Sequence, residues 1–155
     1  MISNIIDFFD YPPLRPFHAV RSTETKKYDN SMLNSIKLIC EDKSEISVDE
    51  GAWGQWDQQA VNCPKNTYLN GFQLKVQPSQ GTEEDDTAAN DIIMFCNGTQ
   101  IKSQHYDDAN FGVWSSIVMC PENMFIRGFN LQIEKRVPYD NTALNNVRMY
   151  CSYDE

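Results

Sequence analysis

The amino-acid sequence predicts an all-β protein built from three related units. A thirteen-residue phrase, YDNSMLNSIKLIC at 28–40, recurs as EDDTAANDIIMFC at 84–96 and as YDNTALNNVRMYC at 139–151. Around these copies, apolar and polar residues alternate with the period of two that is typical of half-buried strands. No stretch of the sequence shows a sustained helical period. We therefore expect a stacked or radially arranged architecture, in which each unit buries one face against its neighbours.

The second and third units align over their whole length. Each contains an aromatic-Gly-x-Trp element, a Cys-Pro pair, a Gly-Phe-x-Leu strand and the final phrase. Cys120 follows Cys63 by 57 residues, and Cys151 follows Cys96 by 55. Before the first unit, no Trp-rich strand or Cys-Pro pair is found, although Phe17 aligns with the phenylalanine of the Gly-Phe strand. The predicted organisation is a single domain, 1–155, with a partial repeat at 17–40 and full repeats at 51–96 and 109–151.

Two long half-buried strands are expected in each full unit. In the earlier strand of the second unit, Phe72, Leu74 and Val76 alternate with Gln73 and Lys75, and residues 129–133 repeat that pattern. The later strand is the end of the thirteen-residue phrase, which follows turn-forming Asp, Asn and Thr residues. The residues expected to face inward there are Ile36, Leu38 and Cys40 in the first copy, Ile92, Met94 and Cys96 in the second, and Val147, Met149 and Cys151 in the third.

The five cysteines follow the units. Equivalence of the second and third units pairs Cys63 with Cys96 and Cys120 with Cys151, and leaves Cys40 unpaired. Regular cysteine spacing is typical of secreted, disulfide-bonded proteins. The first residues nevertheless lack the basic start and the small-residue cleavage site of a signal peptide. The truncated first unit lacks a Cys-Pro pair, so Cys40 has no partner cysteine. We therefore expect the sequence to be a partial chain or one whose start is misassigned.

The composition is that of an acidic globular protein. Lys and Arg number 13 against 22 for Asp and Glu, so the formal net charge is -9. Such a surface repels nucleic-acid phosphate and anionic lipid, and no apolar run approaches the ~20 residues of a membrane-spanning helix. The sequence contains no metal-ligand spacing, no phosphate-cradling glycine loop and no nucleophile elbow. We expect no metal and no other cofactor.

The ordered elements aromatic-Gly-x-Trp, Cys-Pro, Gly-Phe-x-Leu-x-Val and Asp-Asp-Thr-Ala-x-Asn, ending in Cys, resemble the vitelline membrane outer layer protein I family. The resemblance covers residues 51–151 and part of 17–40. It implies a β-prism of three antiparallel sheets in pseudo-threefold repeats, with the first repeat truncated in this sequence. It also implies secretion and a place in an extracellular coat. For the family, a chito-oligosaccharide transferase activity and sugar binding have been suggested.

Candidate catalytic residues come from the acidic loops. Asp85, Asp86 and Asp140 could supply the two carboxylates that glycoside chemistry places ~5–10 Å apart across a sugar. The alternative is a solvated loop in which Asp side chains accept hydrogen bonds from nearby backbone N–H groups. Corresponding positions carry Asp or Asn in all three units. A catalytic pair seldom needs three copies, so the structural alternative is favoured.

Candidate ligand-binding residues are aromatic or amide side chains. Trp53, Trp56 and Trp114 could stack on sugar rings, although large aromatic side chains more often fill a core. Asn90 and Asn145 could bind a sugar hydroxyl.

The position of these asparagines in the units favours a scaffold role. Asn34, Asn90 and Asn145 begin the later strand of their respective units. A buried side-chain amide that recurs in this way needs hydrogen-bond partners at fixed positions in the scaffold. A separate candidate is the sequon Asn97-Gly98-Thr99, which marks Asn97 for N-glycosylation if the protein is secreted.

The favoured function is a secreted structural or interaction protein of an extracellular, egg-coat-like outer layer. The alternative is a carbohydrate-binding module or a weak glycosyltransferase acting on N-acetylglucosamine oligomers, and we favour a protein that is not an enzyme. Expected partners are other extracellular coat proteins, basic ones among them because of the net charge of -9, or an oligosaccharide. Neither nucleic acid nor a membrane is expected as a partner.

Overall fold

The computed structural model describes residues 2–3, 14–21, 32–48, 55–78, 89–103, 112–133 and 144–153. Every regular element in these ranges is a β-strand, and the paired strands run antiparallel. The predicted all-β class is therefore confirmed. No helix within the same ranges is long and apolar enough to cross a membrane.

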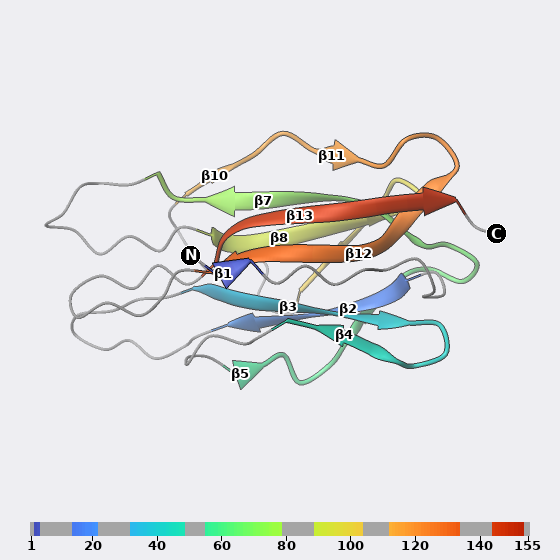
Figure 1. Ribbon diagram of the computed structural model, residues 1–155, viewed down its shortest axis with the longest axis horizontal. Helices are drawn as coiled ribbons and strands as arrows, with labels where there is room; N and C mark the ends of the chain where they lie inside the picture. The colour runs from blue at the N-terminus through green and yellow to red at the C-terminus, as the bar shows by residue number, and fades with distance from the viewer. Residues whose placement is uncertain are drawn as a thin grey trace, which may run out of the picture.

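The strands form three sheets, whose long strands follow the long axis of the molecule (Figure 1). The first sheet contains β2 (Leu14–Arg21), β3 (Leu33–Cys40), β4 (Glu45–Ser47), β5 (Gln55–Trp56) and β6 (Val61–Asn62). The second contains β7 (Leu69–Val76), β8 (Ala89–Cys96), β9 (Thr99–Lys102), β10 (Val113–Trp114) and β11 (Val118–Met119). The third contains β1 (Ile2–Ser3), β12 (Met124–Ile133) and β13 (Leu144–Tyr153).

A long hairpin lies in each sheet: β2–β3, β7–β8 and β12–β13. In β3 the register jumps between Ser35 and Leu33, so Asn34 is the extra residue of a β-bulge. The register jumps over Asn90 in β8 and over Asn145 in β13 in the same way. The asparagines that recur in the sequence therefore occupy bulges at the start of the later strand of each hairpin.

The short strands β5 and β10, which carry Trp56 and Trp114, and their neighbours β6 and β11 pair with the hairpin that precedes them in the sequence. β5 and β6 lie on β2, and β10 and β11 lie on the outer side of β7 (Figure 1). Trp56 is opposite Val20, and Trp114 is opposite Lys75 at the corresponding position of the next hairpin. Each Trp-containing strand thus belongs to the sheet of the preceding unit.

β1 takes the corresponding place on the third hairpin. Ile2 lies opposite Ile133 on β12, just as Val113 lies opposite Val76 on β7. Residues 1–16 have no counterpart in the alignment of the units, yet Ile2 and Ser3 supply an edge strand to the third sheet. Strand pairing requires only backbone hydrogen bonds, so a segment of unrelated sequence can fill this place.

The three sheets share one cluster of buried apolar side chains. The residues predicted to face inward are fully or almost fully buried in β3 and β8, with exposed fractions of 2% or less. In β13, Val147 is buried, but Met149 and Cys151 are only partly buried. Near Met149 and Cys151, the inward side chains of β13 are therefore more exposed to solvent than the corresponding side chains of β3 and β8.

Lys75 departs from the expected alternation, because only 7% of it is exposed. It lies opposite Trp114 of β10, and its Nζ is 5.9 Å from the centroid of that ring. A lysine can bury its aliphatic stem against an apolar surface while its ammonium group remains near an aromatic face. The addition of β10 to the edge of β7 thus covers a residue that the sequence pattern assigns to solvent.

Candidate functional site

Two disulfides join successive sheets. Cys63 follows β6 at the edge of the first sheet and is bonded to Cys96 at the end of β8 in the second sheet. Cys120 follows β11 at the edge of the second sheet and is bonded to Cys151 in β13 of the third. These are the two pairs that equivalence of the units predicts. Cys40, at the corresponding position of β3, is a buried free thiol.

The environment of Cys40 disfavours its thiolate form. Burial raises the pKa of the Cys40 thiol, and the Asp42 carboxylate acts in the same direction, against the opposing effects of a hydrogen bond with Ser44 and of the Arg127 charge. In the same turn, hydrogen bonds from Ser44 lower the pKa of Asp42. The thiol is therefore poorly suited to act as a nucleophile.

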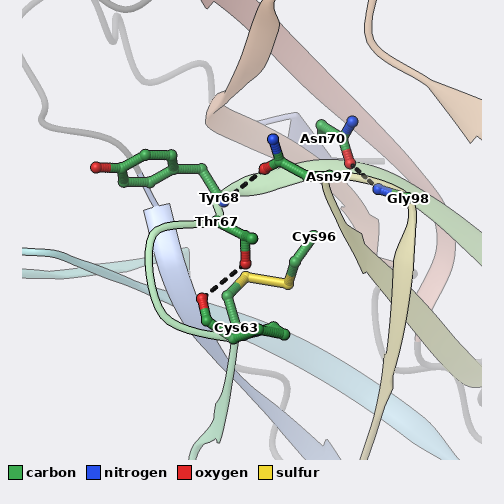
Figure 2. Close-up of a disulfide and its surroundings, with 8 residues drawn as sticks. Cys63, Thr67, Tyr68, Asn70, Cys96, Asn97 and Gly98 are labelled. Atoms are coloured by element: carbon green, nitrogen blue, oxygen red, sulfur yellow. Dashed lines mark hydrogen bonds between the residues drawn. A yellow bond between two sulfur atoms is a disulfide. The ribbon is translucent and has the colours of Figure 1, made fainter.

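The predicted glycosylation site lies in the turn beside the first disulfide (Figure 2). Asn97 is exposed, and it occupies the left-handed region together with Gly98, at φ 46° and 83° respectively. These two residues form the tight turn between β8 and β9, for which Asn-Gly is a favoured sequence. The Oδ1 atom of Asn97 accepts a hydrogen bond from the backbone N–H of Tyr68 at 2.9 Å. The amide nitrogen, the atom to which a glycan would be attached, takes no part in that bond.

The described tryptophans lie at sheet edges and outside the core cluster. Trp56 and Trp114 are each partly buried. The Nζ atom of Lys37 is 4.5 Å from the centroid of the Trp56 ring, and the same atom is 3.0 Å from Oε2 of Glu45. Each of these two tryptophans thus has a lysine over one aromatic face.

Asn34 and Asn90 are buried in their bulges, and Asn145 is partly buried. Within the part of the chain that the structure describes, the amide oxygen and nitrogen of Asn34 have no hydrogen-bond partner. The bulge at Asn90 is closely approached by Gly112, where an added Cβ would lie 2.8 Å from Nδ2 of Asn90 and 3.1 Å from the carbonyl oxygen of Val76. Gly112 also has a φ of +93°. Close approach and backbone conformation together explain the glycine of the aromatic-Gly-x-Trp element.

Four of the candidate residues lie outside the described part of the chain: Trp53, Asp85, Asp86 and Asp140. The predicted pair of catalytic carboxylates therefore stays a prediction. Among the described residues, no group of three or more His, Cys, Asp or Glu side chains is placed to hold a metal ion.

A cavity of about 270 Å³ opens between the second and third sheets. It is lined on one side by Val118 and Met119 of β11 and on the other by Val147 and Met149 of β13. Further lining comes from Phe72, Ile126, Arg148 and Asn146, among others. We call this space the β11–β13 cavity. Sequence reasoning missed it because its walls come from two sheets whose contact is not encoded in any local pattern.

Next to this cavity, the edge of the second sheet is unusually apolar. Val113, Ile117, Val118 and Met119 have exposed fractions of 68%, 50%, 52% and 42%. All four belong to β10, β11 or the link between them. An exposed apolar strip on an edge strand is typical of an interaction surface.

These features define an all-β protein of three antiparallel sheets, in which each disulfide joins the edge of one sheet to the hairpin of the next. The family model described as "Vitelline membrane outer layer protein I (VOMI)" matches residues 17–109 and 101–155. The chain belongs to the vitelline membrane outer layer protein I family, as the resemblance of its motifs predicted.

Two relatives support this assignment. The "Vitelline membrane outer layer protein 1 homolog" of Mus musculus is 39% identical over 107 residues, which are 66% of this chain and 53% of that protein. The homologue of the same name from Homo sapiens is 37% identical over 110 residues, 68% of this chain and 54% of that protein. The matched region therefore spans about half the length of these relatives.

Proposed function

We propose that this protein is a secreted structural or interaction protein of an extracellular outer layer. The observation that carries the proposal is the pair of disulfides, each of which joins the edge of one sheet to the hairpin of the next. Such bonds form and persist in oxidising, extracellular surroundings. The names of the relatives refer to the outer layer of the vitelline membrane, which agrees with this setting.

Two surface properties support an interaction role. The net charge of -9 favours association with basic partners, because opposite charges accelerate encounter and exclude like-charged competitors. The exposed apolar residues of β10 and β11 provide the kind of patch that is covered when proteins associate. Basic proteins of an extracellular coat are the partners that fit both properties.

The proposal is tested by secretion and by coat binding. The chain should be fused to a secretory leader, expressed in animal cells and recovered from the medium with both disulfides formed. The oxidised protein should then bind isolated extracellular coat material, and binding should weaken as the salt concentration rises. Retention inside the cell in reduced form, or absence of binding to coat proteins at low salt, would contradict the proposal.

Carbohydrate binding is a second candidate, and it is favoured by the position of two tryptophans. Trp56 and Trp114 lie at corresponding sheet edges, are partly exposed and lie outside the core cluster. A glycan array with N-acetylglucosamine oligomers would test this function. Binding that is lost in Trp56→Ala and Trp114→Ala, but kept in the corresponding Phe variants, would support stacking on sugar rings. Absence of binding above background would exclude it for the glycans on the array.

A further inference from the structure

The sequence contains two Asn-Gly pairs, Asn70-Gly71 and Asn97-Gly98, and the fold brings them together. The backbone N–H of Gly98 donates a hydrogen bond to Oδ1 of Asn70 at 3.3 Å. In an Asn-Gly pair, the glycine nitrogen can attack the asparagine side-chain amide, because glycine carries no side chain that obstructs the approach. The two pairs share this chemistry, so their surroundings decide whether either of them reacts.

Asn70-Gly71 is held within strand β7. Gly71 is paired with Phe95 of β8 on one side and with Met119 of β11 on the other. The carbonyl oxygen of Asn70 accepts a hydrogen bond from the backbone N–H of Cys120 at 2.7 Å. A ring between the Asn70 side chain and the Gly71 nitrogen could close only if β7 left both neighbouring strands. This pair is therefore unreactive in the folded protein.

Asn97-Gly98 lies in the exposed turn between β8 and β9. Nothing lies within 4 Å of the position that a Cβ on Gly98 would take. Two hydrogen bonds nevertheless hold the reacting atoms apart. In one, the backbone N–H of Tyr68 donates to Oδ1 of Asn97 at 2.9 Å. The other is the bond from Gly98 to Asn70. Figure 2 shows that these bonds point the Asn97 amide and the Gly98 nitrogen in different directions, so attack requires both bonds to open.

The Cys63–Cys96 disulfide anchors the two chain segments that meet at Asn97 (Figure 2). Cys96 immediately precedes Asn97, and Cys63 begins the turn that leads through Thr67 to Tyr68. The hydroxyl of Thr67 donates a hydrogen bond within this turn at 2.7 Å, and its backbone N–H donates another at 3.1 Å. Loss of the disulfide therefore releases the Tyr68 segment from the Asn97 turn.

We propose that Asn97-Gly98 is a deamidation site, and that the Cys63–Cys96 disulfide and Asn70 keep it unreactive in the folded, oxidised protein. When the turn opens, hydroxide removes the amide proton of Gly98, and the Gly98 nitrogen forms a bond to Cγ of Asn97. The Cγ–Nδ2 bond breaks, the departing nitrogen takes a proton from water, and ammonia leaves a five-membered succinimide. Water opens this ring at either carbonyl, which gives aspartate or isoaspartate. The inference goes beyond the proposed function and does not depend on where the protein acts.

Asn70 is a positioning residue that controls the first step. Its amide oxygen is too weak a base to take the Gly98 proton, and while it accepts the hydrogen bond, hydroxide cannot reach that proton. The N–H of Tyr68 controls the second step, because it prevents the Asn97 amide from rotating toward Gly98. Removal of the Asn70 side chain should accelerate deamidation about tenfold, the effect of one lost hydrogen bond on a barrier.

The two products differ in their effect on the β8–β9 hairpin. Isoaspartate adds a carbon atom to the backbone of a two-residue turn that pairs Cys96 with Thr99, so it disturbs the register of this hairpin. Aspartate leaves the backbone unchanged and keeps an oxygen atom for the hydrogen bond from Tyr68. A glycan on Asn97 would occupy Nδ2, the atom that has to leave, so the reaction concerns chains without a glycan at this residue.

The first experiment compares the two Asn-Gly pairs in one molecule. The full chain is produced in bacteria, which add no N-glycan of this kind, then oxidised and incubated at pH 8. Reduction and trypsin then place the pairs in separate peptides, 66–75 and 76–102, in which mass spectrometry measures the conversion of amide to acid. We expect slow conversion of both pairs in the oxidised protein. In urea, conversion of Asn97 should be much faster.

Removal of a disulfide tests whether the control is local. The double variant Cys63→Ala/Cys96→Ala should convert Asn97 more than about tenfold faster than the wild type, because the turn opens more often. The matched control is Cys120→Ala/Cys151→Ala, which opens a loop of nearly equal length away from Asn97 and should keep a rate close to the wild-type rate. Equal acceleration in the two double variants would overturn the inference, as would equal rates at Asn97 in the folded protein and in urea.

Two variants of Asn70 separate its hydrogen bond from a general loss of stability. Asn70→Ala should accelerate conversion of Asn97 about tenfold. Asn70→Asp should keep the slow rate, because a carboxylate accepts the same hydrogen bond and repels hydroxide. Labelling by an isoaspartyl methyltransferase identifies the isoaspartate product, and in urea both variants should react as the wild type does. A wild-type rate in folded Asn70→Ala, or equal acceleration in both variants, would overturn the role of Asn70.

Discussion

Met94 and Ile101 lie directly opposite each other in the β8–β9 register, and both side chains are buried. Met149 occupies the place of Met94 in the third hairpin, where no described strand covers it. The same residue type in the same register thus has two environments, and within the described strands they differ by the presence of β9 beside β8.

Truncation of these two methionines should therefore have unequal costs. We expect Met94→Ala to lower the free energy of unfolding by about 2–5 kcal/mol, as is usual for a fully buried side chain. Met149→Ala should cost less than half as much, because part of the side chain already contacts solvent. Urea denaturation of the two variants measures the difference. Equal losses would show that Met149 is covered as well as Met94 is.

Removal of a disulfide should destabilise the protein strongly. The bonds close loops with sequence separations of 33 and 31 residues. Loops of this length predict a loss of roughly 3–4 kcal/mol for each double Cys→Ala variant. Because the two loops are nearly equal, the Cys63/Cys96 and Cys120/Cys151 variants should unfold at similar urea concentrations. A loss well below about 1 kcal/mol for either bond would contradict the expectation.

The Cys40 thiol should react slowly in the folded protein. Only 2% of the residue is exposed, and burial raises the pKa of its thiol. Alkylation by iodoacetamide at pH 8 should be much slower in the native protein than in urea, as mass spectrometry can measure. Rapid alkylation of the native protein would show that Cys40 is accessible.

The raised thiol pKa also sets the direction of a pH effect on stability. The folded state keeps the Cys40 proton above about pH 8.5, where the thiol of an unfolded chain ionises. Its contribution to stability is therefore fully present below that pH and is lost as the pH rises toward the folded-state pKa. Cys40→Ala is the control, because it removes this thiol and leaves every other titrating group in place. Identical stability profiles for the two proteins between pH 7 and 10 would contradict the assignment.

Asn97 should carry a glycan when the chain passes through the secretory pathway. Its side chain is exposed in the β8–β9 turn, and the hydrogen bond with Tyr68 uses only its oxygen. Removal by a glycosidase that cleaves N-glycans should reduce the mass by one glycan. Thr99→Ala is the matched control, since it destroys the sequon but leaves the Asn97–Tyr68 hydrogen bond. If glycosidase treatment left the mass of the wild-type protein unchanged, Asn97 would carry no glycan and the prediction would be wrong.

Two glycines with similar backbone conformations should respond differently to substitution. Gly98 and Gly112 have φ values of +83° and +93°. Gly98→Ala should cost about 1 kcal/mol, the usual penalty for a left-handed backbone, because nothing lies within 4 Å of the added Cβ. Gly112→Ala should cost a further ~1–3 kcal/mol, because the new methyl group meets Asn90 and the backbone of Val76. Thermal unfolding of the two variants tests the order, and a smaller loss at Gly112 would contradict it.

Much of the candidate site was not predictable from the sequence. The recurring asparagines were expected at the start of the later strands, but their position in β-bulges depends on the register with the neighbouring strand. The lysines over Trp56 and Trp114 were not predicted, because in each case the two residues come from different strands. The β11–β13 cavity was missed for the same reason, since residues far apart in the chain line it.

The sequence by itself determined the all-β class, the inward residues of β3 and β8 and the partners of four cysteines. Alternation along a strand is a local property, and the equivalence of the units follows from the alignment of their residues. Only the tertiary structure decided that the Trp-containing strands join the preceding hairpin, that β1 completes an edge of β12, and that the outer edge of β13 lacks a described strand. The physical reason is that backbone hydrogen bonds between edge strands carry little sequence information, so long-range packing selects which edges meet.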